Sequence, residues 1–172
     1  TEPVARLEVK MDVGNVKTLL LSTAAQYYLL GRQYSALTKS ATDHQGEWLF
    51  DYLARSTRWN SRNIRAGCFR LQPSIQMTPL VKLPEWIHAE LGFYVAETDL
   101  EGHWAVIDTA LHLTAQLTDA LRLCRDHIRD PVAHQQIQYL VDIDIEFQSH
   151  LAHALRTPLQ IIVGSKLTAS TG

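Results

Sequence analysis

A histidine and two acidic residues stand at helical spacing near position 44 and are candidates for metal binding. His44, Glu47 and Asp51 occur at i, i+3 and i+7, so in a helix they lie on one face. Imidazole and carboxylate groups are ligands that suit iron and other divalent metals. The alternative is an ordinary solvated first turn, in which acidic side chains interact favourably with the helix dipole.

A second set of acids and histidines follows later in the chain. Asp142, Glu146 and His150 repeat at i, i+4 and i+8, so side chains that face inward from neighbouring helices would form a metal site inside a bundle. Shorter repeats at i and i+4 occur at Asp108 and His112 and at Glu97 and Glu101. None of these has the Glu-x-x-His spacing of the usual intra-bundle di-iron site. Polar helix faces or hydrogen bonds between subunits are the alternative explanation.

Two long helices are predicted in the first half of the chain. Apolar and aromatic residues recur every three to four positions from 12 to 39, and again from about 44 to 67, which is typical of amphipathic helices. The small and polar residues at 40–43 suit a turn in which Asp43 caps the second helix.

Two more helices are predicted in the second half. The third has the most regular apolar period of the chain, follows a capping-box pattern at Thr98 and Glu101, and ends near 128. Asp130 and the proline after it are typical of a helix start, and the fourth helix is expected to stop at Pro158.

The segment 68–83 loses the helical period and contains Pro73 and Pro79, so a crossover is predicted there, followed by a short helix that begins at Pro84. Short first and last turns with one long crossover are typical of the ferritin-like four-helix bundle. We expect an all-α single domain over 1–172, with a core bundle over about 12–156, flexible tails, and second and third helices that are antiparallel partners.

The bulk composition excludes several classes of protein. The formal charge of −2 gives no overall basic excess, and the few basic residues near the N-terminus alternate with acids, so direct DNA binding is doubtful. The longest apolar stretches are far shorter than the roughly 20 residues that cross a bilayer. Cys68 and Cys124 are expected to be reduced thiols. No association with a membrane is expected, and a cytoplasmic location is the default.

Three segments resemble Dps proteins, the mini-ferritins: YLLGRQY at 28–34, EWLFD at 47–51 and MTPL at 77–80. The short helix after Pro84 and the last helix are similar too, so the resemblance spans about 12–156. It implies a dodecameric shell built from two-fold dimers. It also implies that ferrous iron is oxidised by peroxide at a site between subunits and stored as mineral, often by a shell that coats DNA.

The resemblance places one half of the iron site near the first turn. The position of the first histidine falls on Tyr34 or the serine after it, and the second histidine with its carboxylate falls around His44, Glu47 and Asp51. These three residues are the predicted metal ligands, for iron or another divalent metal. Trp48 lies among them and is a candidate radical quencher, so Tyr34 and Trp48 are the residues predicted to take part in the oxidation.

The other half of the resembling site is altered. The acidic pair that a partner subunit would supply falls on or beside Ser61, Arg62 and Arg65, and a cation there repels a divalent metal. Arg62 or Arg65 could instead pair with Glu47 or Asp51 across a two-fold axis, which would replace metal binding by a salt bridge.

The turn between the third and fourth helices resembles the three-fold pore of the family. Asp126 and Asp130 flank it, and rings of carboxylates concentrate cations at such a pore. Helix capping is the alternative for Asp130. Aromatic side chains near a site can quench radicals or simply pack the core; the candidates are Tyr27, Tyr28, Trp48, Trp59 and Trp86.

Two hypotheses from different classes follow. The first is a Dps-like iron-storage protein and ferroxidase that protects against peroxide, with iron entering through acidic pores of a homo-oligomeric shell. The rival is a non-catalytic ferritin-like protein that assembles but has lost its metal site, and serves as a structural or interaction module.

Overall fold

The computed structural model describes residues 14–41, 43–84 and 103–168, with side chains over 14–41, 43–84 and 107–153. Its helices are α1 (Val16–Ser40), α2 (His44–Arg70), α3 (Pro73–Gln76), α5 (His103–His127) and α6 (Pro131–Thr168). Within these ranges the only β interaction is an isolated bridge between Asn15 and Pro79. The prediction of an all-α bundle of long helices is confirmed.

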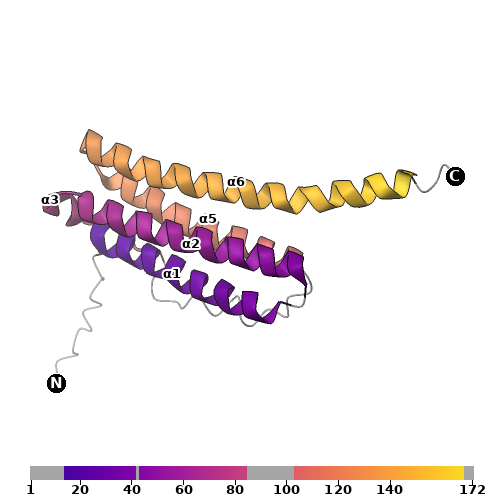
Figure 1. Ribbon diagram of the computed structural model, residues 1–172. Helices are drawn as coiled ribbons and strands as arrows, with labels where there is room; N and C mark the ends of the chain where they lie inside the picture. The colour runs from indigo at the N-terminus through magenta and orange to yellow at the C-terminus, as the bar shows by residue number, and fades with distance from the viewer. Residues whose placement is uncertain (1–13, 42, 85–102, 169–172) are drawn as a thin grey trace, which may run out of the picture.

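Polar side chains fix where the first two long helices begin. The Asn15 side chain accepts a hydrogen bond of 2.8 Å from the Thr18 amide at the start of α1. Asp43 accepts one of 2.6 Å from the Gly46 amide at the start of α2, as its predicted capping role requires. The turn at 40–43 therefore joins α1 and α2 as a tight helical hairpin (Figure 1).

The segment after α2 is tied to the beginning of α1. The Val16 amide donates to the Thr78 carbonyl at 3.0 Å, and the Leu80 amide donates to the Gly14 carbonyl at 2.9 Å. Prolines end the helical period here as predicted, and only the single turn of α3 forms between Arg70 and Pro79. The predicted short helix after Pro84 and the capping box at Thr98 lie outside the described residues.

Helix α6 corrects one prediction. Asp130 caps it and Pro131 occupies its first turn as expected, but the helix continues through Pro158 to Thr168 instead of stopping there. A proline inside a helix removes one hydrogen bond and disfavours the turn before it, yet it can be accommodated by bending rather than by ending the helix. Figure 1 shows the C-terminal part of α6 projecting beyond the other long helices.

The order of packing corrects a second prediction. Helix α1 contacts α2 and α5, and α6 contacts α5 and α2. Val16 lies against Cys124 and Tyr27 against Thr114, so α1 and α5 are antiparallel. Because α1 is also antiparallel to α2, helices α2 and α5 run in the same direction and lie diagonally across the bundle. They were expected to be antiparallel partners; the segment between them instead returns the chain to the opposite end before α5 begins.

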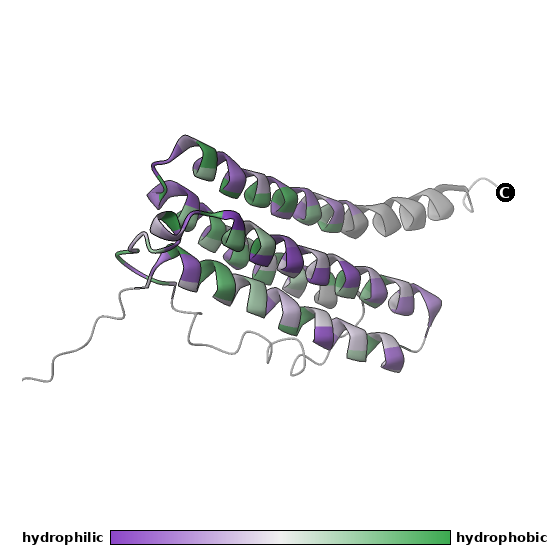
Figure 2. Cartoon of the chain, turned by 60° about the vertical axis from the view of Figure 1, so that its left-hand side comes forward, coloured by the Kyte–Doolittle hydropathy of each residue, from purple (hydrophilic) through white to green (hydrophobic). Residues whose placement is uncertain are grey.

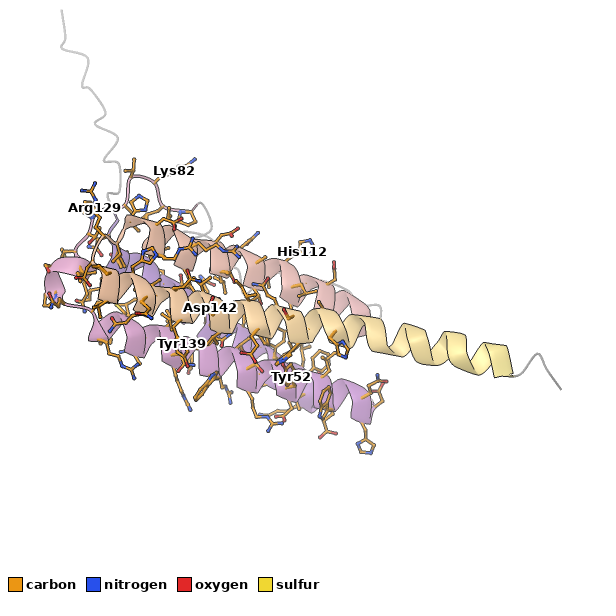
Figure 3. The ribbon with its side chains drawn as sticks, turned by 90° about the horizontal axis from the view of Figure 1, so that it is seen from above. Tyr52, Lys82, His112, Arg129, Tyr139 and Asp142 are labelled. Carbon is orange, nitrogen blue, oxygen red and sulfur yellow. The ribbon has the colours of Figure 1, made fainter. Side chains whose placement is uncertain are left out.

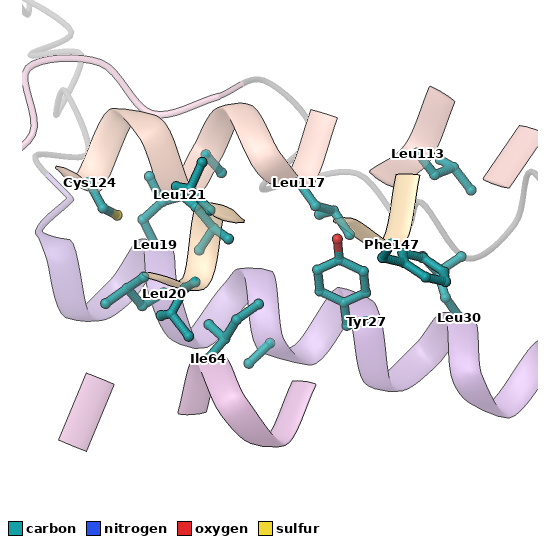
Figure 4. Packing of buried hydrophobic residues seen from close by; sticks show 14 of the residues in the cluster. Leu19, Leu20, Tyr27, Leu30, Ile64, Leu113, Leu117, Leu121, Cys124 and Phe147 are labelled. Carbon is teal, nitrogen blue, oxygen red and sulfur yellow. The ribbon is translucent and has the colours of Figure 1, made fainter. Parts of the chain in front are cut away.

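One apolar core fills the space between the four long helices. Figure 4 shows leucines of α1 and α5 meeting there beside Ile64 of α2. Figure 2 shows hydrophobic and hydrophilic residues alternating around the helices, as expected for elements with one buried face. None of the described helices combines the length and the apolar character that crossing a bilayer would require.

The close approach of α1 and α2 depends on Gly31. A Cβ atom at this position would lie 2.9 Å from Cγ of Arg58 and 3.0 Å from Oγ1 of Thr57. We predict that Gly31→Val lowers the free energy of unfolding by about 1–3 kcal/mol, because overpacking forces the two helices apart. Urea unfolding followed by circular dichroism measures this. Ala36→Val, at an exposed position of the same helix, is the control; equal losses in both variants would show that the contact is unimportant.

Candidate functional site

Of the predicted metal ligands in α2, His44 and Glu47 are exposed and Asp51 is half-buried, and only His44 and Glu47 approach each other. Nδ1 of His44 lies 3.6 Å from Oε2 of Glu47. Asp51, one turn further, instead forms an ion pair of 2.6 Å with Nη2 of Arg55. The shared face predicted from the spacing is present, but Asp51, the third of the predicted ligands, already has the Arg55 cation beside it.

The two residues predicted to take part in oxidation lie in different surroundings. Trp48 is 62% exposed and its ring stacks on Tyr52, with centroids 5.8 Å apart. Tyr34 is buried in the core, where desolvation raises the pKa of its hydroxyl. Tyr34 and Trp48 therefore do not share a site within one chain.

The acids around the turn before α6 have local partners. Asp126 accepts a hydrogen bond of 2.8 Å from Nε of Arg125. Asp130 accepts one of 2.8 Å from the Ala133 amide, which is the capping role given as its alternative. The cation pore needs several subunits and stays a prediction.

The later acids and histidines do not face inward. Asp142, Glu146 and His150 are all exposed, and Asp142 accepts a hydrogen bond from Gln138. Figure 3 shows His112 at the outer edge of α5, away from Asp142 on α6. Of the second pair of acids, Glu97 and Glu101, no structure is described. Across the described ranges, no group of three or more His, Cys, Asp and Glu side chains is arranged to hold a metal ion.

Among the acids whose side chains the structure describes, Asp144 of α6 is the one that is buried, with 1% of its surface exposed. Tyr27 of α1 donates a hydrogen bond of 2.8 Å to its Oδ2, and the Thr118 hydroxyl of α5 lies 3.3 Å from the same oxygen. Figure 4 shows the Tyr27 hydroxyl pointing from α1 toward α5, next to Leu117. Three helices thus supply the groups of one buried polar cluster.

Further polar side chains extend this cluster. Gln148 donates a hydrogen bond of 2.6 Å to Oγ1 of Thr118. Asn60 of α2, which is 3% exposed, interacts with the Tyr27 hydroxyl, and so does Thr114 of α5. All four long helices therefore contribute to what we call the Asp144 cluster: Tyr27, Asn60, Thr114, Thr118, Asp144 and Gln148.

Burial dominates the electrostatics of the Asp144 cluster. It raises the pKa of the Asp144 carboxyl from its ordinary 3.8 to about 7, while the hydrogen bonds from Tyr27 and Thr118 act in the opposite direction. The pKa of the Tyr27 hydroxyl is also raised, first by burial and then by the charge of Asp144. Within the described ranges no Lys or Arg forms an ion pair with Asp144. The cluster can therefore take up or release a proton near neutral pH.

Sequence reasoning missed Asp144, although a signal was present. The apolar face of α6 runs through Ile137, Val141, Phe147 and Leu151, and Asp144 occupies the position that continues this period between them. An acid on an otherwise apolar helix face is the pattern that identifies a buried carboxyl. The regular spacing of Asp142, Glu146 and His150 pointed instead to residues that face solvent.

We predict that the stability of the protein falls as pH rises from about 4 to 7. Below this window Asp144 is protonated in both states. Within it only the unfolded chain ionises, which stabilises the unfolded state relative to the folded state until the folded carboxyl ionises near pH 7. The loss amounts to about 4 kcal/mol by the pKa difference.

Asp144→Asn removes this titration, so its unfolding free energy, measured by urea denaturation between pH 4 and 8, should lack that fall. Asp142→Asn, which changes an exposed acid two positions away, should follow the wild-type curve. Parallel curves for the wild type and Asp144→Asn would contradict the assignment.

The chain matches no protein-family model, no curated protein and no solved structure in comparisons with known proteins. Its function is therefore argued from the arrangement of its own residues.

Proposed function

We propose that this chain is a non-catalytic ferritin-like subunit that assembles with copies of itself, and that ion pairs replace the metal ions of a Dps-like dimer interface. The observation that carries the proposal is the separation of charge along the exposed face of α2. Its two acids lie near its start and its arginines follow from Arg55 to its end, so the acids of one copy are complementary to Arg62 and Arg65 of a second copy.

The acidic end of this face contains Glu47 and Asp51, both in the first two turns of α2. The basic end contains Arg62 and Arg65, and no acid occurs in the sequence from 52 to 70. The offsets between these four positions keep them within one side of the helix, which is exposed at Glu47, Arg62 and Arg65 and half-buried at Asp51. Charges of opposite sign are thus placed at opposite ends of one surface.

A two-fold axis near the middle of α2 would bring the two ends together. In an antiparallel pair of α2 helices, Glu47 of each copy lies opposite Arg65 of the other, and Asp51 lies opposite Arg62. In such an isologous contact each ion pair occurs twice, because the two-fold axis generates a second copy of it. Arginine forms bidentate hydrogen bonds with carboxylates, which would fix the register of the pair.

Exposed apolar side chains border the same face. Tyr28 of α1 is 52% exposed and Phe69 of α2 is 55% exposed, with the guanidinium of Arg65 lying 5.6 Å from the Phe69 ring. Large exposed apolar groups beside a charged surface are typical of a protein interface. Burial of these rings would supply the nonpolar part of the binding energy, while the ion pairs would supply the register.

Charge reversal tests this proposal. We predict that Arg65→Glu weakens self-association at least tenfold, because it places two acids opposite each other in both halves of the interface. The double variant Glu47→Arg with Arg65→Glu exchanges the two charges and should restore association. Sedimentation equilibrium measures both against the 19.5 kDa single chain.

The matched control is Arg122→Glu, which reverses a half-buried arginine of α5 that pairs with Asp119. Its association should equal that of the wild type. A monomeric wild type, or a double variant as weak as the single one, would contradict the proposed pairing.

A second candidate function is the Dps-like storage of iron, with oxidation at a modified site. The contact between His44 and Glu47 favours it, because two exposed ligands at the start of α2 could meet a metal ion between subunits. Their partner would have to come from another copy, and Arg62 and Arg65 of that copy would oppose a divalent cation.

Ferrous loading without oxygen, followed by peroxide, separates the two functions. The assembly proposal predicts no ferric absorbance above that of a buffer blank, and no change in Glu47→Gln. A ferric core that holds well over two irons per chain, and that is lost in Glu47→Gln, would establish iron storage instead.

A further inference from the structure

A groove opens between α2 and α6, on a side of α2 next to the proposed self-association face. Tyr52 lies against Phe147 and Gly67 against Leu140, so the two helices are antiparallel neighbours, but they contact each other less than α1 contacts α2. The groove has a volume of about 390 Å³ and is lined from both helices. That volume is enough for a small organic molecule.

Three aromatic side chains form much of the groove lining. Tyr52 and Trp59 come from α2, and Phe147 comes from α6. The rings of Tyr52 and Phe147 have centroids 6.3 Å apart with an interplanar angle of 40°. Trp48 stacks on Tyr52 with an interplanar angle of 9°, which restricts the orientation of the Tyr52 ring. The groove therefore offers π-systems with restricted orientations.

The charges around these rings favour a cation. Glu146 lines the groove and forms no ion pair with the part of the chain that the structure describes. Arg55 also lines it, but its guanidinium is bound to Asp51 at 2.6 Å, so its charge is offset. An electron-rich aromatic lining beside one unpaired carboxylate attracts positively charged ligands.

Asn60 forms part of the inner wall of the groove and is 3% exposed. Its side chain interacts with the Tyr27 hydroxyl in the interior. Asn60 also belongs to the Asp144 cluster, so the groove meets the buried acid through this side chain.

We propose that this groove binds a small organic cation of the methylated-ammonium class, with the ammonium group against Tyr52, Trp59 and Phe147 beside Glu146. The attraction between a desolvated cation and aromatic faces supplies the selectivity for charge. This site lies between α2 and α6, away from Glu47, Arg62 and Arg65 of the proposed self-association face, and only Asp51 borders both through its ion pair with Arg55.

Choline and its uncharged carbon isostere, 3,3-dimethylbutan-1-ol, test the proposal on the full chain. The two molecules have the same shape and differ in charge, so burial of apolar surface alone would bind them equally. Isothermal titration calorimetry should show choline binding at least tenfold more tightly than the isostere. Equal affinities, or no heat from choline at concentrations up to tens of millimolar, would overturn the proposal.

Variants locate the site. Glu146→Gln and Trp59→Ala should each weaken choline binding roughly tenfold, since one removes the charge and the other removes an aromatic face. Tyr139→Ala, which truncates a 65% exposed aromatic residue of α6 that does not line the groove, should bind choline as the wild type does. Both altered side chains, Glu146 and Trp59, are exposed, so the fold is expected to be retained and circular dichroism checks it. Unchanged affinity in Glu146→Gln and Trp59→Ala would place the cation elsewhere and overturn the assignment.

Discussion

The burial of Asp144 constrains the rest of this bundle. A carboxyl group in an apolar interior is tolerated only when donors surround it, and here the donors come from Tyr27 on α1 and Thr118 on α5. A helix that rotated by one residue would turn its donor away by about 100°. The hydrogen bonds to this one side chain therefore fix the relative register of α1, α5 and α6.

The same constraint decides which surfaces remain outside. With their polar and apolar core residues committed inward, α1 and α2 leave a face with acids at one end and arginines at the other. Helix α6, held mainly against α5, leaves a groove beside α2. The proposed self-association and the proposed cation site thus occupy different sides of α2, and Asn60 connects the second of them to the buried acid. Protonation of Asp144 would remove a negative charge behind Asn60, which forms part of the inner wall of the groove.

The helices and their caps were predictable because their signals are local. Asp43 and Asp130 cap the helices whose apolar periods begin just after these two residues. The prolines after residue 70 interrupt the helical period as expected. The continuation of α6 past Pro158 was not predicted, since a proline lowers helical stability without dictating where a helix ends. The parallel course of α2 and α5 depends on how the chain returns between them, which periodicity does not determine.

The buried cluster could be predicted only in part. Asp144 interrupts an apolar stripe and could have been recognised from that alone, but Tyr27, Asn60 and Thr118 lie on three other helices and have no fixed spacing relative to it. The exposed candidates, by contrast, share a helix and were placed on one face correctly. Whether His44 and Glu47 meet a metal ion depends on a second chain.

The most direct test of the account is the ionisation of Asp144 itself. The ¹³C chemical shift of its carboxyl carbon, assigned by comparison with Asp144→Asn and followed from pH 3 to 9, reports the protonation state at that position. We expect a midpoint near 7, well above that of an exposed aspartate such as Asp142. A midpoint near 4 would mean that the carboxyl is solvated, and that it is not the buried group on which the register of α1, α5 and α6 depends.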